Sequence, residues 1–350
     1  MLDVRGSPER RPGHEHAHWT VGRVAFLAIS AIALYLFAPS IADVFSAYDR
    51  LGDVHPIFLL PAAACAVAAF GCVWLVQALA LGTRDWFSIV TTQLAGNAFN
   101  RITPGGGATG TALQVNMLHD AGFNVTHTAT ALTVQSVLST AAIVALPVFA
   151  LPFVVAGTQV PSGLLQALWI GIPVFMLMVA IGIAIFVTDG PLRMLGCAVA
   201  WVRCRFRRAD MDTELGARLL EDRDRIRREI APHWELALGA SLARWLFEYG
   251  VLLFTLWGLS ADPDPALVLL AFVAASVLGL LPLTPGGLGF VEAGLAATLA
   301  VAGISTGDAL VATLVYRLLT FWLPIPLGGI AALVFRRRHP RRSRHLSQPA

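Results

Sequence analysis

The tetrapeptide Thr-Pro-Gly-Gly occurs twice in this chain, at residues 103–106 and 284–287, and the second copy interrupts an otherwise apolar run. Proline removes a backbone hydrogen-bond donor and glycine lowers helix propensity, so each copy is expected to break a helix. In hydrocarbon, a broken backbone is tolerated only where protein or a watery cavity covers its polar groups. The two breaks therefore predict an enclosed polar region, with the rest of the chain arranged around it.

Apolar segments recur along the 350-residue chain, each about as long as the roughly 20 residues that an α-helix needs to cross a bilayer. Hydrophobic residues make up 56% of the composition and charged residues 13%, a balance that points to a polytopic membrane protein rather than soluble domains. The four cysteines form no close-spaced pair, which argues against a zinc site or a disulfide framework. Six full transmembrane helices are predicted, over residues 21–45, 57–81, 125–156, 164–187, 235–259 and 308–335.

The two breaks lie in segments that we predict to be helical hairpins, residues 86–117 and 265–304. The first segment carries too many hydrogen-bonding side chains for a helix that faces lipid. Its apolar arms are each too short to cross a hydrocarbon core of about 30 Å at roughly 1.5 Å per residue. We therefore expect it to enter the membrane, turn at the glycine loop and return to the same side. The second segment has a longer first arm, so the alternative that both of its arms cross the membrane stays open.

The distribution of arginine predicts how these segments are oriented. All 25 basic residues are arginine, and the positive-inside rule assigns arginine-rich short loops to the cytoplasm. With both termini inside, Arg50 is the only arginine left outside. The first hairpin must then enter from the cytoplasm and the second from outside, as in an inverted-topology repeat. The predicted fold is an all-α polytopic membrane protein with six full transmembrane helices and two re-entrant or broken hairpins in an inverted repeat.

Charge and hydropathy divide the chain into five parts. The polar N-terminal part contains His14, His16 and His18, which suit a metal-binding tail or, more simply, a solvated tail. The five parts are a cytoplasmic tail (1–20), a first membrane half (21–188) with the glycine hairpin 86–117, a cytoplasmic amphipathic linker (189–234), a second membrane half (235–335) with the glycine hairpin 265–304, and a basic cytoplasmic tail (336–350).

Arg317 lies about ten residues into the last predicted span, near the middle of the bilayer. A guanidinium matches phosphate oxygens, so one interpretation is an anion-binding residue with Tyr316 beside it. The other interpretation is a buried ion pair with Glu292 that locks the second hairpin, and both hold if a ligand competes for the pair. Glu292 follows the second glycine loop, where the start of a half-helix stabilises its charge. It suits a simple helix-start acid, or a site for a cationic headgroup or a proton.

Arg101 lies next to Asn100 and three residues before Pro104, a position from which it can face the first glycine loop. Glycine amides at the start of a half-helix form a cradle for an anion. Arg244 and Glu248 are one helical turn apart and are interpreted as a structural pair. No catalytic or metal-ligand combination occurs, so no catalytic residue, metal or cofactor is predicted. The predicted substrate-binding residues are Arg317, Glu292, Arg101, Gly105, Gly106, Gly107, Gly286, Gly287, Tyr316 and Asn100.

Two stretches of this sequence resemble the lysylphosphatidylglycerol synthase transmembrane (flippase-domain) family. The first glycine motif of that family is similar to GNAFNRITPGGGATGTAL, and its carboxy-terminal signature to PGGLGFVEAGLAATLAVAGISTGDALVATLVYRLLTFWLPIPLGGIAAL. The similarity covers most of residues 20–335, and by it Glu292 and Arg317 fall on the family's acid and arginine. In the first motif, many relatives carry an acid or an arginine where this chain has Thr111 and Gln114.

The resemblance implies an integral protein of the bacterial inner membrane. The best understood members of the family fuse this domain to a soluble aminoacyltransferase and move the aminoacylated phospholipid to the outer leaflet. No transferase segment occurs in these 350 residues, so transferase activity is not expected.

The leading hypothesis is a flippase-like transporter that moves a phospholipid or a lipid-linked anionic headgroup between leaflets. The alternative is a non-catalytic membrane subunit that binds a polyprenyl-phosphate or phospholipid intermediate and docks a separate soluble transferase through residues 189–234. An intramembrane lipid-modifying enzyme is a third hypothesis, weakened by the few acid and base groups. No nucleic-acid partner is expected.

Overall fold

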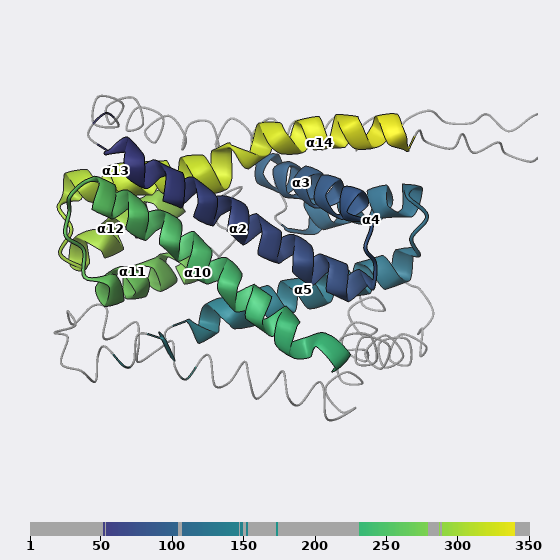
Figure 1. Cartoon of the computed structure of the whole chain (residues 1–350), viewed down its shortest axis with the longest axis horizontal. Helices are drawn as coiled ribbons and strands as arrows, with labels where there is room; N and C mark the ends of the chain where they lie inside the picture. Colours follow the sequence, from purple (N-terminus) through teal and green to yellow (C-terminus); the bar gives the residue numbers. More distant parts are fainter. Residues whose placement is uncertain are drawn as a thin grey trace, which may run out of the picture.

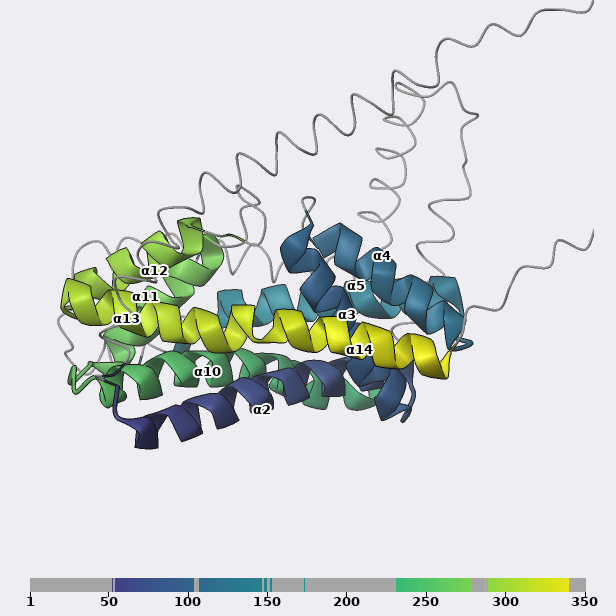
Figure 2. The same ribbon diagram turned by 90° about the horizontal axis from the view of Figure 1, so that it is seen from above.

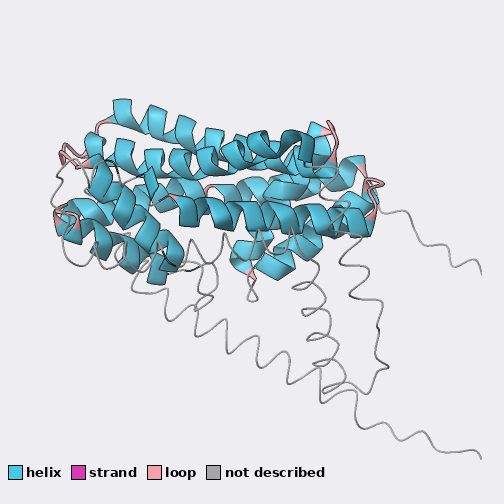
Figure 3. Cartoon of the chain, turned by 90° about the horizontal axis from the view of Figure 1, so that it is seen from below, coloured by secondary structure: helices cyan, strands magenta, loops and turns pink. Residues whose placement is uncertain are grey.

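The fold comes from a computed structural model, which describes residues 54–103, 107–146, 231–278 and 289–339 and the single positions 52, 148, 149, 152, 173 and 287. All regular structure in these ranges is helical (Figure 3). The predicted spans 21–45 and 164–187 lie outside the described residues, apart from position 173, as does nearly all of the predicted linker.

Four described helical stretches are long and apolar enough to cross a membrane, and they coincide with four of the six predicted spans. The last of them, Thr306–Arg338, consists of α13 (Thr306–Arg317), the π-helical turn η3 (Leu318–Trp322) and α14 (Pro324–Arg338). The prediction of an all-α membrane fold is confirmed to this extent. The other three stretches are α2 (Pro56–Leu81), α5 (Val125–Ala145) and α10 (Trp234–Gly258), which follows the short helix η1 (Ala231–His233).

Each break separates two short helices that pack against each other. The first pair is α3 (Trp86–Ile102) and α4 (Gly107–Asp120), and the second is α11 (Pro265–Leu278) and α12 (Phe290–Val301). At about 1.5 Å per residue, the 17 residues of α3 reach roughly 26 Å, less than a hydrocarbon core of about 30 Å. The other three helices are shorter still. The two hairpins lie at opposite ends of the long axis of the bundle (Figures 1 and 2).

Side chains in the turns cap the helices that follow them. The Asp85 carboxylate accepts a hydrogen bond from the backbone N–H of Ser88 at 3.2 Å, at the start of α3. Asn124 does the same for Thr126 at the start of α5, at 2.9 Å, and Asp264 accepts from the first turn of α11. Because the first backbone donors of a helix have no partner inside it, these caps help to determine where each helix begins.

Helices α2 and α10 pack antiparallel and run side by side through the middle of the bundle (Figure 1). The backbone N–H of His55, before α2, donates to the carbonyl of Gly258, at the end of α10, at 3.0 Å. Small residues allow close approach along the contact: Ala62 and Ala66 are buried, and Cys65 Sγ lies 3.2 Å from where a Cβ on Gly250 would be. Without a strong hydrophobic drive between helices in lipid, such small-residue contacts supply the packing.

Helix α14 lies against α3 at the first-hairpin end of the bundle (Figure 2). The contact is closest at Gly328, where an added Cβ would collide with the Leu94 carbonyl and with the Ala98 Cβ. The neighbouring Gly329 is exposed, and a Cβ there would meet nothing within 4 Å. The absence of a side chain at Gly328 therefore determines how closely the last helix approaches the first hairpin.

We predict that Gly328→Ala lowers the thermal stability of the detergent-solubilised protein. Overpacking of this kind typically costs about 1–3 kcal/mol. The matched control is Gly329→Ala, which should leave the unfolding midpoint unchanged or raise it, because alanine has the higher helix propensity. Equal midpoints for the two variants would contradict the close approach of α14 to α3.

Candidate functional site

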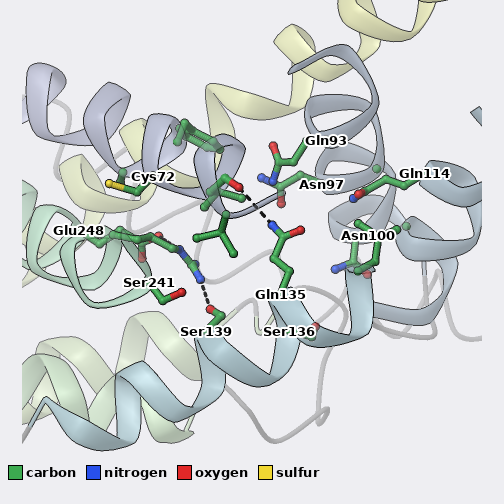
Figure 4. A pocket seen from close by; sticks show the side chains of 18 of the residues that line it. Cys72, Gln93, Asn97, Asn100, Gln114, Gln135, Ser136, Ser139, Ser241 and Glu248 are labelled. Atoms are coloured by element: carbon green, nitrogen blue, oxygen red, sulfur yellow. Dashed lines mark hydrogen bonds and ion pairs between the residues drawn. The ribbon is translucent and has the colours of Figure 1, made fainter. Parts of the chain in front are cut away.

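A polar cavity of about 260 Å³ lies among α2, α3, α4, α5 and α10 (Figure 4). Both helices of the first hairpin contribute to its wall, so the cavity adjoins the first break. Its charged lining residues are Arg101, Arg244 and Glu248, with a formal net charge of +1 from two arginines and one glutamate. Its neutral polar lining consists of amides and hydroxyls: Gln93, Asn97, Asn100, Thr111, Gln114, Gln135, Ser136, Ser139, Ser241 and Thr320.

Arg244 and Glu248 form the i,i+4 pair that the sequence predicts, with Nη2 and Oε1 at 3.0 Å. Arg244 also donates to the Ser139 hydroxyl, so the pair links α10 to α5. The sequence-based interpretation of a purely structural pair missed the fact that both side chains also line the cavity. The available signal was the position of two charges inside an apolar span, where charge is usually functional.

Arg101, on α3, reaches across to the other end of the chain. Its Nε donates to Asn97 Oδ1 at 3.0 Å, and its Nη1 donates to the backbone carbonyl of Thr320 at 2.6 Å. That carbonyl is available because Pro324, four residues later, has no N–H to donate to it. The arginine of the first break therefore satisfies a backbone group that proline leaves open in the last helix.

The last helix changes its hydrogen-bonding pattern at this point. The N–H of Leu323 donates to the carbonyl of Leu318, five residues back, at 2.9 Å, which is the π-helical pattern of η3. π-Helical turns are frequent at functional sites. The Phe321 ring in this turn lies near two guanidinium groups, with its centroid 4.7 Å from Arg101 Cζ and 4.1 Å from Arg317 Cζ. One aromatic ring thus contacts the arginine of the first break and the arginine of the last span.

Arg317 and Glu292 form the ion pair that was one of the two interpretations of Arg317. The Arg317 Nε donates to Glu292 Oε1 at 2.6 Å, and the two side chains are 8% and 15% exposed. Glu292 lies in the first turn of α12, where the helix dipole favours a negative charge. The pair joins the second hairpin to the end of α13. Arg317 itself does not line the cavity described above.

Tyr316 connects this ion pair to the cavity. It is buried, directly precedes Arg317, and donates its hydroxyl proton to Glu248 Oε2 at 3.2 Å. Glu248 therefore contacts Arg244 through one oxygen and Tyr316 through the other. A change in the position of Arg317 has a direct path to the cavity through its neighbour in the chain.

The glycine loops are described only in part. Gly105, Gly106 and Gly286 lie outside the described residues, whereas Gly107 begins α4. Gly287 has a φ of 69° and Gly289, the N-cap of α12, a φ of 77°, values that favour glycine. The second loop therefore needs glycine at these positions, independently of any role in binding. Of the predicted substrate-binding residues, the cavity wall contains Arg101 and Asn100.

We predict that Arg317→Leu and Glu292→Leu are each more destabilising than the double substitution. Removing one partner of a buried pair typically costs about 3–5 kcal/mol, because the other charge is left uncompensated, whereas replacing both can be nearly neutral. The measurement is the unfolding midpoint of the three purified variants, with Arg337→Leu at the exposed end of α14 as the control. A double variant no more stable than the worse single variant would show that the two side chains do not depend on each other.

Residues 23–328 match the model of a family described as the lysylphosphatidylglycerol synthase TM region. A UPF0104 membrane protein of Methanothermobacter thermautotrophicus is 26% identical over 306 residues, which cover 82% of this chain and 88% of that protein. The range matched by the family model contains both breaks, the residues that line the cavity and the Arg317–Glu292 pair.

Proposed function

Because the chain belongs to the lysylphosphatidylglycerol synthase transmembrane-region family, we propose that it is a flippase-like transporter that moves a lipid with an anionic headgroup between leaflets. The transported molecule would be a phospholipid or a lipid-linked phosphate. Its headgroup would enter the polar cavity while its acyl chains stayed in the bilayer. The cavity volume of about 260 Å³ supports a site for the headgroup alone, since it falls just below the volumes of about 300–1,000 Å³ that are usual for pockets that hold a whole small molecule.

The observation that carries the proposal is the environment of Arg101. Arg244 is paired with Glu248 and Arg317 with Glu292, whereas the acceptors of Arg101 in the described part of the chain are both neutral. A buried charge without a counter-ion is costly in a low-dielectric interior. Phosphate oxygens supply the missing charge and suit the planar donors of a guanidinium. We assign Arg101 as the principal anion ligand and Asn100 as its neighbour in the same site.

The remaining predicted residues are assigned to the second hairpin and to the loop tips. Arg317, Glu292 and Tyr316 form a connected group beside the cavity, and a phosphate that competes for Arg317 would loosen the second hairpin. The released Glu292 carboxylate would then be free to take a proton or a cationic group. The amides of Gly105, Gly106, Gly107, Gly286 and Gly287 would complete the anion cradle.

Transport by alternating access is supported by the arrangement of the hairpins. They lie at opposite ends of the bundle, and the central helices α2 and α10 are antiparallel (Figure 1). Both features fit an inverted repeat, in which one half rocks against the other around a site at the midplane. The repeat, with six full spans, remains part of the proposal.

The charges at the two ends of the bundle support an orientation. The Arg338 Cζ lies 4.3 Å from the Phe87 ring centroid, so the basic end of α14 is next to the Arg84 turn. Asp262 and Asp264 lie in the turn between α10 and α11, where the second hairpin begins. By the positive-inside rule, we place the arginine-rich end and both chain termini in the cytoplasm of a bacterial cell with this protein in its inner membrane.

We predict that Arg101→Met slows the translocation of a fluorescent anionic phospholipid in proteoliposomes by about tenfold to a hundredfold, as expected for losing charged hydrogen bonds worth about 1.5–3 kcal/mol. Arg101→Lys keeps the charge but not the planar donors, so its rate should be intermediate. The control is Arg337→Ala, at an exposed position, with wild-type transport expected.

Two results would contradict this assignment. A folded Arg101→Met variant with wild-type transport would remove Arg101 from the site. A wild-type protein that moves no anionic lipid, but co-purifies with a soluble transferase, would instead favour the accessory-subunit hypothesis. That hypothesis depends on residues 189–234, most of which lie outside the described residues.

A further inference from the structure

Resting on the transport function proposed above, we infer that the cavity selects a hydroxyl-rich phosphate headgroup without an amino group, such as a phosphoglycerol or a phosphosugar. Three features of the described wall carry this inference: an arginine whose hydrogen-bond acceptors are both neutral, a set of neutral amides and hydroxyls, and a single carboxylate that already accepts hydrogen bonds through both of its oxygens.

The phosphate would bind at Arg101. The cavity wall has a net formal charge of +1, and Arg101 is the one of its two arginines whose described acceptors are both neutral. Asn97 already directs its carbonyl oxygen to Arg101, so the amide N–H₂ of Asn97 remains available as a second donor. An anion at Arg101 would therefore be held by a charged and a neutral donor from the same face of α3.

The amides and hydroxyls suit a polyol. Five amide side chains line the cavity, and Figure 4 shows Gln93, Asn97, Asn100 and Gln114 gathered on one side of it, with Gln135 across from them. Amides and hydroxyls each offer donors and acceptors together, as the hydroxyls of glycerol and sugars also do. Asn100 Oδ1 is buried and has no hydrogen-bond partner among the residues that the structure describes. A buried acceptor left unpaired is costly, so a ligand hydroxyl that donates to it is favoured.

An ammonium would find no comparable partner. Glu248 is the only carboxylate in the described wall, and its Oε1 accepts from Arg244 at 3.0 Å while its Oε2 accepts from Tyr316 at 3.2 Å. Phe70 is the only aromatic ring in that wall, too few for an aromatic cage. An amino group in the headgroup would thus lose its water without gaining a negative partner.

The test compares headgroups in proteoliposomes containing the full chain. Phosphatidylglycerol, phosphatidylethanolamine and lysyl-phosphatidylglycerol, all with the same labelled acyl chains, are assayed separately. We expect phosphatidylglycerol to be translocated at least about tenfold faster than the two amino lipids, because a site rejects a headgroup whose polar groups it leaves unpaired.

Free glycerol phosphate is then added as a competitor of phosphatidylglycerol transport. Inhibition of phosphatidylglycerol transport by the free compound, as strong as that by unlabelled lipid, would identify the soluble ester rather than the lipid as the ligand and overturn the lipid-headgroup assignment.

A substitution then tests the cause of the selectivity. Asn100→Asp places a carboxylate in the cavity with little change of shape, and it should shift the rate ratio toward the amino lipids by about tenfold. The control is Phe99→Leu, the preceding residue on α3, whose side chain is 42% exposed. It should leave the ratio unchanged. Because both transport rates in a ratio are measured on the same variant, a smaller fraction of folded protein lowers both rates equally and leaves the ratio unchanged.

Thermal stabilisation of the protein by each lipid is measured alongside transport. Stabilisation reports binding and lipid movement reports transport, so the headgroup selectivity and the transport proposal can fail separately. Equal or faster movement of lysyl-phosphatidylglycerol overturns the selectivity while transport stands. Selective stabilisation by phosphatidylglycerol without movement of any lipid supports the selectivity and overturns transport. If no lipid is bound or moved, both fail.

Discussion

The backbone carbonyl of Thr320 joins the first hairpin to the π-helical turn in the last helix. Pro324 cannot donate to it, and an unsatisfied carbonyl in an apolar bundle is costly. Arg101, from the first hairpin, donates to it at 2.6 Å. Because one guanidinium has five donors, Arg101 can serve this carbonyl and Asn97 and still face the cavity. The Arg101 side chain therefore does two things: it satisfies a backbone carbonyl of the last helix, and it contributes a positive charge to the cavity wall.

The arginines inside the bundle differ in how their charge is balanced. Arg244 and Arg317 each have a carboxylate partner, at 3.0 Å and 2.6 Å. The first pair lies within α10, from which Arg244 also reaches Ser139 on α5, and the second joins α12 to the end of α13. Such pairs stabilise little in net terms, but breaking one leaves a buried charge, so each strongly favours one arrangement of the helices. Arg101 has neutral acceptors in the described chain, and this difference is the reason for proposing Arg101, rather than Arg244 or Arg317, as the principal anion ligand.

The connections also suggest how binding can be transmitted. Tyr316 contacts Glu248 in the cavity wall, and its neighbour Arg317 holds the second hairpin through Glu292. The π-helical turn that follows begins directly after Arg317 and carries Phe321, which contacts both Arg101 and Arg317. A ligand that binds Arg101 or Arg317 would therefore alter the contacts of that arginine with Phe321, which the other arginine also contacts. The route is short and contiguous, as coupling between two packed elements requires.

Much of the fold follows from local sequence. The length and hydropathy of the apolar runs predicted the four spans that the structure describes, and proline with glycine predicted both breaks, because these residues act through their own backbone geometry. Glu292 and Arg317 were predicted as a possible pair because two isolated charges in hydrocarbon are each expected to find a partner. The cavity role of Arg244 and Glu248 was not predicted, since i,i+4 spacing accounts for their pairing without any third element.

The sequence alone determined that this chain is helical, that it belongs in a membrane, and where its helices break, because each of these properties depends on residues that are neighbours in the chain. Only the tertiary structure decided which polar groups share a cavity. Arg101 and Thr320 are 219 positions apart, and Tyr316 and Glu248 are 68 apart. Their contacts depend on the packing of α13 against α10 and on the close approach of α14 to α3, where the absence of a side chain at Gly328 removes the steric barrier. Those distances follow from packing between helices, and no local pattern encodes them.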